Sequence, residues 1–141
     1  MTTAYNIRRI REARRLGYAE LSRLLADRGR KIAPLGLRRI ESGDRRVDAD
    51  DLIALAMTLN VSPLALLLPR EASLLMPSGD EYPAELIWQW GAGERPLAGE
   101  PTEHDTAEGR ANMYFDYLRE SNPAAWAALL AAVPADYEGT K

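Results

Sequence analysis

Five short segments within the first 69 residues carry leucine, isoleucine or alanine at about every third or fourth position. This spacing gathers the apolar side chains on one face of an α-helix. Glycine or proline stands between most of the segments, where a helix ends or begins at little cost. The pattern therefore predicts five helices, over residues 5–16, 18–28, 34–42, 49–59 and 63–68.

The residues at the predicted helix ends agree with this pattern. Gly29 and Gly43 follow the second and third segments, and glycine commonly ends a helix in the left-handed conformation. Pro34 suits the first position of a helix. Asp48 precedes the fourth segment, where its carboxylate can cap free backbone N–H groups. We therefore expect an all-α fold.

Charge is divided unevenly along the chain. Residues 1–47 contain 13 Lys+Arg and 5 Asp+Glu, which gives a net charge of +8. Residues 48–141 contain 5 and 16, which gives −11. This asymmetry is typical of a nucleic-acid-binding end joined to an acidic remainder.

The second half is rich in proline, glycine and acidic residues before helical spacing returns over 107–121 and 124–133. A short helical element is expected around Trp88 and Trp90. The last two helices carry more apolar and aromatic surface than a lone tail would expose, so we expect them to dimerise, dock another protein or fold back. The sequence predicts three parts, which are a helical domain over 1–69, an acidic linker over 70–106 and a helical region over 107–141.

Several function classes are disfavoured by what the sequence lacks. There is no cysteine and a single histidine, His104, so thiolate zinc sites, disulfides, thiol nucleophiles and histidine-rich metal cages are excluded. No nucleophile–base arrangement stands out, and we expect no enzyme activity, no metal and no cofactor. No apolar run reaches the length of about 18 residues that a membrane helix needs. The charged N-terminus does not resemble a secretory signal, so we expect a cytoplasmic protein.

Three blocks of residues carry a resemblance to a known family. They read NIRRIREARRLGYAELSRLL, LGLRRIESGDRRV and DDLIALAMTLNVSPLALLL. In this order they resemble the DNA-binding domain of the lambdoid phage repressors and Cro, the xenobiotic-response-element-type regulators, and above all their actinobacterial members. The resemblance covers residues 5–69. It implies a five-helix lambda-repressor-like domain with a helix-turn-helix, here with a helical acidic C-terminal extension.

The resemblance also implies a function. The chain would be a sequence-specific double-stranded DNA-binding transcriptional regulator, more often a repressor than an activator. Such proteins usually bind an operator as homodimers, with half-sites about one helical turn apart. One departure is the stretch ADRGRKIAP before the third helix, which is longer than in typical members and leaves the position of that helix in the DNA groove open.

Site residues follow from the same resemblance. The base-reading positions match Pro34, Leu35 and Arg39, with Arg38 beside them; Leu35 suits a thymine methyl, and an arginine can bond a guanine through N7 and O6. Because Arg38 and Arg39 point about 100° apart on a helix, only one should reach bases, and the match favours Arg39. The expected phosphate contacts are Tyr18, Arg30, Lys31, Arg45 and Arg46. Arg11 and Glu41 match a structural ion pair between the first and third helices.

A second function class stays open. The chain would then be a protein-interaction module, antitoxin-like or an adaptor, whose main act is to bind a protein partner through residues 84–133. Co-purification of a partner in a defined ratio would favour it.

Overall fold

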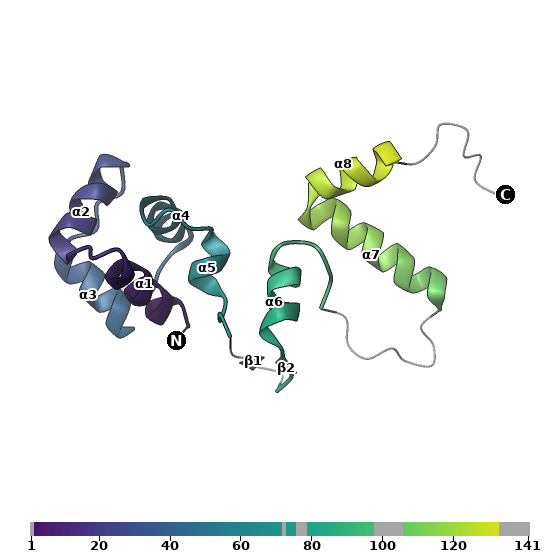
Figure 1. Cartoon of the computed structure of the whole chain (residues 1–141), viewed down its shortest axis with the longest axis horizontal. Helices are drawn as coiled ribbons and strands as arrows, with labels where there is room; N and C mark the ends of the chain where they lie inside the picture. Colours follow the sequence, from purple (N-terminus) through teal and green to yellow (C-terminus); the bar gives the residue numbers. More distant parts are fainter. Residues whose placement is uncertain (1, 72, 76–78, 98–105, 133–141) are drawn as a thin grey trace. The chain divides into compact units, whose positions relative to one another are not determined.

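The structure is a computed structural model that describes residues 2–71, 73–75, 79–97 and 106–132. Within these ranges the regular secondary structure is helical apart from one short antiparallel ladder, in which β1 (Leu74–Leu75) pairs with β2 (Glu81–Tyr82) (Figure 1). The helices are α1 (Thr2–Ala13), α2 (Tyr18–Asp27), α3 (Pro34–Ser42), α4 (Ala49–Thr58), α5 (Pro63–Leu67), α6 (Ala84–Gly91), α7 (Ala107–Ser121) and α8 (Pro123–Ala132). The expected all-α class is confirmed at this level.

Two compact units make up the chain, and each is described by itself. Unit 1 spans residues 1–84 and unit 2 spans residues 85–141. The boundary therefore differs from the division into 1–69, 70–106 and 107–141 that the sequence favours. His104 lies outside the described residues.

Helices α1 to α5 of unit 1 enclose a core of leucine and isoleucine side chains. Leu21, Leu55 and Leu59 are completely buried, and the core continues through Ile7, Ile10, Leu25, Ile32, Leu37, Ile40, Ala56 and Leu66. Burial of such side chains stabilises a fold by about 1.5–3 kcal/mol each. The core fixes the angle at which α3 lies against α1 and α2, and so decides which face of α3 reaches solvent.

Asn6 ties α1 to the end of α5. Its side-chain amide is 2% exposed and donates hydrogen bonds to the carbonyl oxygens of Leu66 (3.2 Å) and Leu68 (2.9 Å). The bonds satisfy two carbonyl groups at the end of a short helix, where no further helical turn can do so.

The first helix begins and ends earlier than its apolar spacing predicts. It ends at Ala13 because Arg15 adopts a left-handed conformation with φ of 56°. The backbone N–H of Leu16 then donates to the carbonyl oxygen of Arg11 at 3.1 Å, which folds Leu16 back toward the core. Gly17, expected to form the break, has φ of −74°, so its missing side chain is not needed for this turn.

Asp48 caps α4 as its sequence position predicts. Its side chain accepts a hydrogen bond from the backbone N–H of Asp51 at 2.6 Å. This bond, helped by the nearby Arg30 guanidinium, holds the pKa of Asp48 below its ordinary value of 3.8. The cap satisfies one of the free N–H groups of the first turn.

The lowered pKa gives a test of the cap. A carboxylate with a lower pKa in the folded state stabilises the fold fully above its unfolded pKa and loses that contribution as pH falls through the folded value. Asp48→Ala should therefore lower the melting temperature at pH 7, and the difference from wild type should shrink at pH values below 3.8. Thermal unfolding followed by circular dichroism at both pH values measures it. If the melting temperatures of Asp48→Ala and wild type differ equally at both pH values, the Asp48 carboxylate does not cap α4.

Unit 2 is built around the corner between α7 and α8. The Tyr117 hydroxyl donates to the carbonyl oxygen of Trp90, and the Asn122 side chain donates to that of Ala92 at 3.3 Å. Gly93 has φ of 71°, and a Cβ there would lie 2.7 Å from the carbonyl oxygen of Ser121. The end of α6 is thus packed on the C-terminal helices, although its sequence surroundings resemble a linker.

Candidate nucleic-acid interface

Helix α3 presents an exposed face without a carboxylate. Its buried residues are Leu37 and Ile40, whereas the exposed ones are Pro34, Leu35, Arg38, Arg39 and Ser42. The Leu35 side chain is 60% exposed. The one acidic residue of the helix, Glu41, has a side chain only 3% exposed. The outward face therefore offers two guanidinium groups and an apolar side chain.

Glu41 anchors α3 to α1 and to the start of α2. Its carboxylate accepts two hydrogen bonds from the Arg11 guanidinium, at 2.6 and 2.8 Å, and one from the Tyr18 hydroxyl at 2.8 Å. Arg11 also donates to the carbonyl oxygen of Leu16 at 2.9 Å. The ion pair expected from the sequence is present. The hydrogen bond to Glu41 raises the pKa of Arg11 above its ordinary value, which favours the charged guanidinium.

Tyr18, a predicted phosphate contact, makes several contacts within unit 1. Its hydroxyl is already bonded to Glu41, and burial, followed by that hydrogen bond, raises its pKa. The guanidinium carbon of Arg11 lies 4.3 Å from the centre of its ring, and that of Arg38 lies 5.2 Å away. Both distances are within the range of cation–π attraction. Tyr18 thus holds Arg38 against the start of α2.

This contact separates the two neighbouring arginines of α3. Arg38 lies over the Tyr18 ring, whereas Arg39 has no ion-pair or ring partner among the described residues. Arg39 is therefore the side chain of the pair that is free to extend from the exposed face. The sequence favours the same residue for base contact.

The long connection between α2 and α3 is held by a buried carboxylate at the start of α4. Asp51 is 1% exposed; one oxygen accepts from Arg30 at 2.7 Å and the other from Arg45 at 2.8 Å. Arg30 also bonds Asp48 at 2.7 Å. Ser22 donates to the carbonyl oxygen of Ile32 at 2.7 Å. The residues that lengthen the connection between α2 and α3 are thus an ordered part of unit 1. We call Arg30, Arg45, Asp48 and Asp51 the ionic cluster.

The ionic cluster changes the set of phosphate candidates. Arg30 and Arg45 already have carboxylate partners, so a phosphate would have to displace Asp51 from each of them. Lys31 and Arg46 are exposed and form no ion pair within the described ranges. Because an unpaired cation gains more from a phosphate than a neutralised one, Lys31 and Arg46 are the stronger candidates of the four.

No group of three or more histidine, aspartate or glutamate side chains among the described residues is placed to hold a metal ion. In the same ranges every helix falls short of the length and apolar character that a membrane span requires. Comparisons with protein-family models, with curated proteins and with solved structures gave no match to the chain.

Proposed function

We propose that unit 1 is a lambda-repressor-like helix-turn-helix domain that reads double-stranded DNA with α3, and that the chain is a transcriptional regulator acting as a repressor. The observation that carries the proposal is the outer face of α3. It exposes Leu35, Arg38 and Arg39, while the only carboxylate of the helix is turned inward onto Arg11. The exposed acid Asp44 lies beyond the end of α3, where it accepts a hydrogen bond from Ser42. An acid on that face would repel phosphate.

Each side chain has a defined task in this proposal. Arg39 donates to N7 and O6 of a guanine in the major groove, and Leu35 lies against a thymine methyl. Arg38, held over Tyr18, reaches a phosphate beside the start of α2. Lys31 and Arg46 bind further phosphates, which add affinity and salt dependence without reading sequence.

The proposal is tested by fluorescence anisotropy with the full chain. DNA from upstream of the protein's own gene should bind more tightly than a scrambled duplex of equal length, by about 10³-fold, a typical specificity ratio. The same promoter should be transcribed less in vitro when the protein is added. Equal and weak binding of both duplexes would contradict the proposal.

The ionic cluster supplies an independent prediction. Asp51→Asn removes the carboxylate charge that binds Arg45, so the Arg45 guanidinium becomes available to phosphate, whereas Arg30 keeps its ion pair with Asp48 at 2.7 Å. Binding to scrambled duplex should strengthen. The slope of log affinity against log salt concentration should steepen by about 0.9, the value for one added phosphate contact.

The matched control is Asp27→Asn, which removes an exposed carboxylate that pairs with Arg23 on α2. It makes the same charge change outside the ionic cluster. Circular dichroism verifies that both variants are folded. If Asp51→Asn leaves the salt slope equal to that of Asp27→Asn, then Arg45 does not lie near phosphate.

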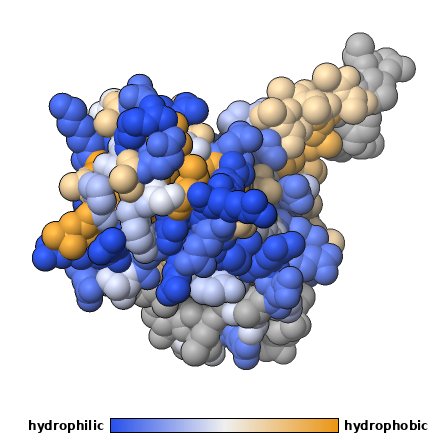
Figure 2. All heavy atoms as spheres, turned by 60° about the vertical axis from the view of Figure 1, so that its left-hand side comes forward, coloured by the Kyte–Doolittle hydropathy of each residue, from blue (hydrophilic) through white to orange (hydrophobic). Residues whose placement is uncertain are grey.

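A second candidate function has its own observation in unit 2. Helix α8 consists only of proline, alanine, tryptophan and leucine and buries none of its residues. Helix α7 buries only Leu118, and Met113, Phe115 and Leu130 are 46, 40 and 54% exposed. Figure 2 shows a continuous hydrophobic surface on the helix that leads to the grey end of the chain. A helix that is apolar all round is normally covered.

We propose that a protein covers this apolar surface. A second copy of the chain would give the homodimer that reads two half-sites, and a different protein would make the chain an interaction module. The double variant Leu129→Ser/Leu130→Ser should convert a dimer to a monomer in light scattering coupled to size exclusion. The control Ala127→Ser, also on exposed α8, should leave the mass unchanged. A wild-type monomer that co-purifies with another protein in fixed ratio would favour the interaction module.

A further inference from the structure

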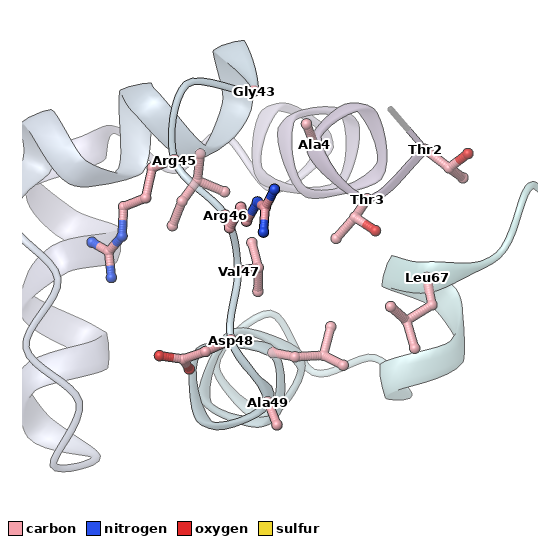
Figure 3. Close-up of a pocket in the computed structure, with 12 residues that line it drawn as sticks. Thr2, Thr3, Ala4, Gly43, Arg45, Arg46, Val47, Asp48, Ala49 and Leu67 are labelled. Carbon is pink, nitrogen blue, oxygen red and sulfur yellow. The ribbon is translucent and has the colours of Figure 1, made fainter.

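A cavity of about 600 Å³ opens within unit 1. The first turn of α1, the loop between α3 and α4, the start of α4 and the end of α5 surround it (Figure 3). Its walls are mostly apolar, and Val47, Ala49, Leu52 and Leu67 contribute to them. Leu67 is 42% exposed. This volume and this lining are those of a small-molecule site, which usually combines apolar walls with a few polar groups.

Arg46 supplies the positive charge of the cavity. Arg45 and Arg46 are consecutive in the loop, yet Figure 3 shows their guanidinium groups on opposite sides of it. Arg45 points toward the ionic cluster, where it binds Asp51 at 2.8 Å. Arg46 points toward the first turn of α1, and it has no ion-pair or hydrogen-bond partner in the part of unit 1 that the structure describes.

The other polar groups of the cavity fit a single negative charge. Thr2 and Thr3 lie across the opening from Arg46 (Figure 3), and their hydroxyl groups can donate to an anion. Asp48 also lines the cavity, but its carboxylate is bonded to Arg30 at 2.7 Å and does not neutralise Arg46. A ligand with several negative charges would be repelled by Asp48 and poorly matched to the apolar walls.

We propose that this cavity binds a small molecule with an apolar body and one carboxylate. The carboxylate accepts charge-assisted hydrogen bonds from the Arg46 guanidinium, which can bind it through two N–H groups. The apolar body lies against Val47, Leu52 and Leu67 and leaves water. The ligand class is therefore that of a medium-chain fatty acid or a similar amphipathic acid.

Ligand binding to Arg46 also affects DNA binding. This part of the inference rests on the function proposed above. Arg46 is one of the two strongest phosphate candidates. One guanidinium group cannot bind a ligand carboxylate and a DNA phosphate at the same time. The ligand therefore weakens DNA binding, and DNA weakens ligand binding by the same factor.

The first experiment measures ligand binding without DNA, by isothermal titration of the full chain with two probes. Octanoate has the charge and apolar body that the cavity requires, and octanamide has nearly the same shape without the charge. Wild type should bind octanoate at least about tenfold more tightly than octanamide, a difference of about 1.4 kcal/mol.

Three variants locate the site. Arg46→Gln should abolish the preference for octanoate. Ala49→Trp should weaken both probes, because Ala49 is an exposed wall residue where a larger side chain fills the cavity. Arg14→Gln removes an equal charge from a residue that bonds the carbonyl oxygen of Asn60 outside the cavity, and it should bind like wild type. If Ala49→Trp fails to fold, the difference between the affinities of Arg46→Gln for octanoate and for octanamide still tests the proposed site.

Several outcomes would overturn the inference. These are no binding of octanoate, equal binding of both probes, and a preference that survives Arg46→Gln. A wild-type dimer that Ala49→Trp dissociates would show that a second copy fills the cavity instead. In a separate measurement, octanoate but not octanamide should weaken binding to the preferred duplex. Octanoate binding without any DNA binding would support the cavity and contradict the proposed regulator function.

Discussion

Replacement of Glu41 by alanine is expected to lower the free energy of unfolding by about 3–5 kcal/mol, the usual cost of leaving one member of a buried ion pair without its partner. Arg11 and Glu41 have side chains only 9 and 3% exposed. In the variant, the Tyr18 hydroxyl loses its acceptor, and the Arg11 guanidinium keeps only the Leu16 carbonyl oxygen at 2.9 Å and the exposed Glu12 carboxylate at 3.6 Å. Urea unfolding followed by circular dichroism measures the change.

The control for this prediction replaces all three groups together. The triple variant Arg11→Met/Tyr18→Phe/Glu41→Leu leaves no buried charge or donor unpaired, so it should be more stable than Glu41→Ala despite carrying more changes. A loss below about 1 kcal/mol in Glu41→Ala, a value typical of an exposed pair, would show that the carboxylate does not anchor α3.

Arg39→Ala should weaken binding to the preferred duplex by about 1–3 kcal/mol, which corresponds to about 5- to 150-fold. Binding to a scrambled duplex should change much less, because phosphate contacts through Arg38, Lys31 and Arg46 remain. The reason is the exposed position of Arg39 on α3 without a partner, which lets it donate two hydrogen bonds to one guanine.

Arg14→Ala is the matched control for Arg39→Ala. It also removes one exposed arginine from unit 1, but Arg14 bonds the carbonyl oxygen of Asn60 beyond the end of α4. Its affinity for both duplexes should stay close to that of wild type. Equal losses on both duplexes in Arg39→Ala would assign Arg39 to phosphate and remove it from base reading.

The helices with clear end signals were predictable from sequence. Pro34 begins α3, and Gly43 follows it with φ of 85°. Asp48 caps α4 through the N–H of Asp51. Each signal acts within four residues of the backbone group that it satisfies, so it can be recognised without tertiary structure. The end of α1 could not be predicted, because Arg15 adopts a left-handed conformation with φ of 56°, which residues other than glycine, asparagine and aspartate rarely do.

The interaction partners of the candidate site residues were harder to predict from the sequence. The sequence indicates that Asp51 lies in the positive first turn of a helix, but not that its oxygens bind Arg30 and Arg45. Arg30 is separated from Asp51 by 21 positions. Such pairs depend on how the α2–α3 connection folds, for which no local pattern exists. The resemblance that places Arg11 opposite Glu41 likewise gave no sign that Tyr18 would share the carboxylate.

In unit 2, the local composition predicts a linker where the structure has tertiary packing. Glycine and proline near Gly93 favour a linker, yet Gly93 is required by its close approach to the Ser121 carbonyl oxygen. Tyr117 and Asn122 donate to backbone carbonyl groups from α7 and the corner that follows it. These bonds join segments about 30 positions apart. A glycine-rich stretch alone does not reveal them.

Base reading by α3 can be tested by pairing one side chain with one base. In the preferred duplex, each guanine is replaced in turn by 7-deazaguanine, which lacks the N7 acceptor, and binding is measured for wild type and Arg39→Ala. We predict one guanine at which the replacement weakens wild-type binding but causes no further loss in Arg39→Ala. If every replacement weakens the two proteins by the same factor, Arg39 does not contact guanine N7, and α3 does not read DNA in the way proposed.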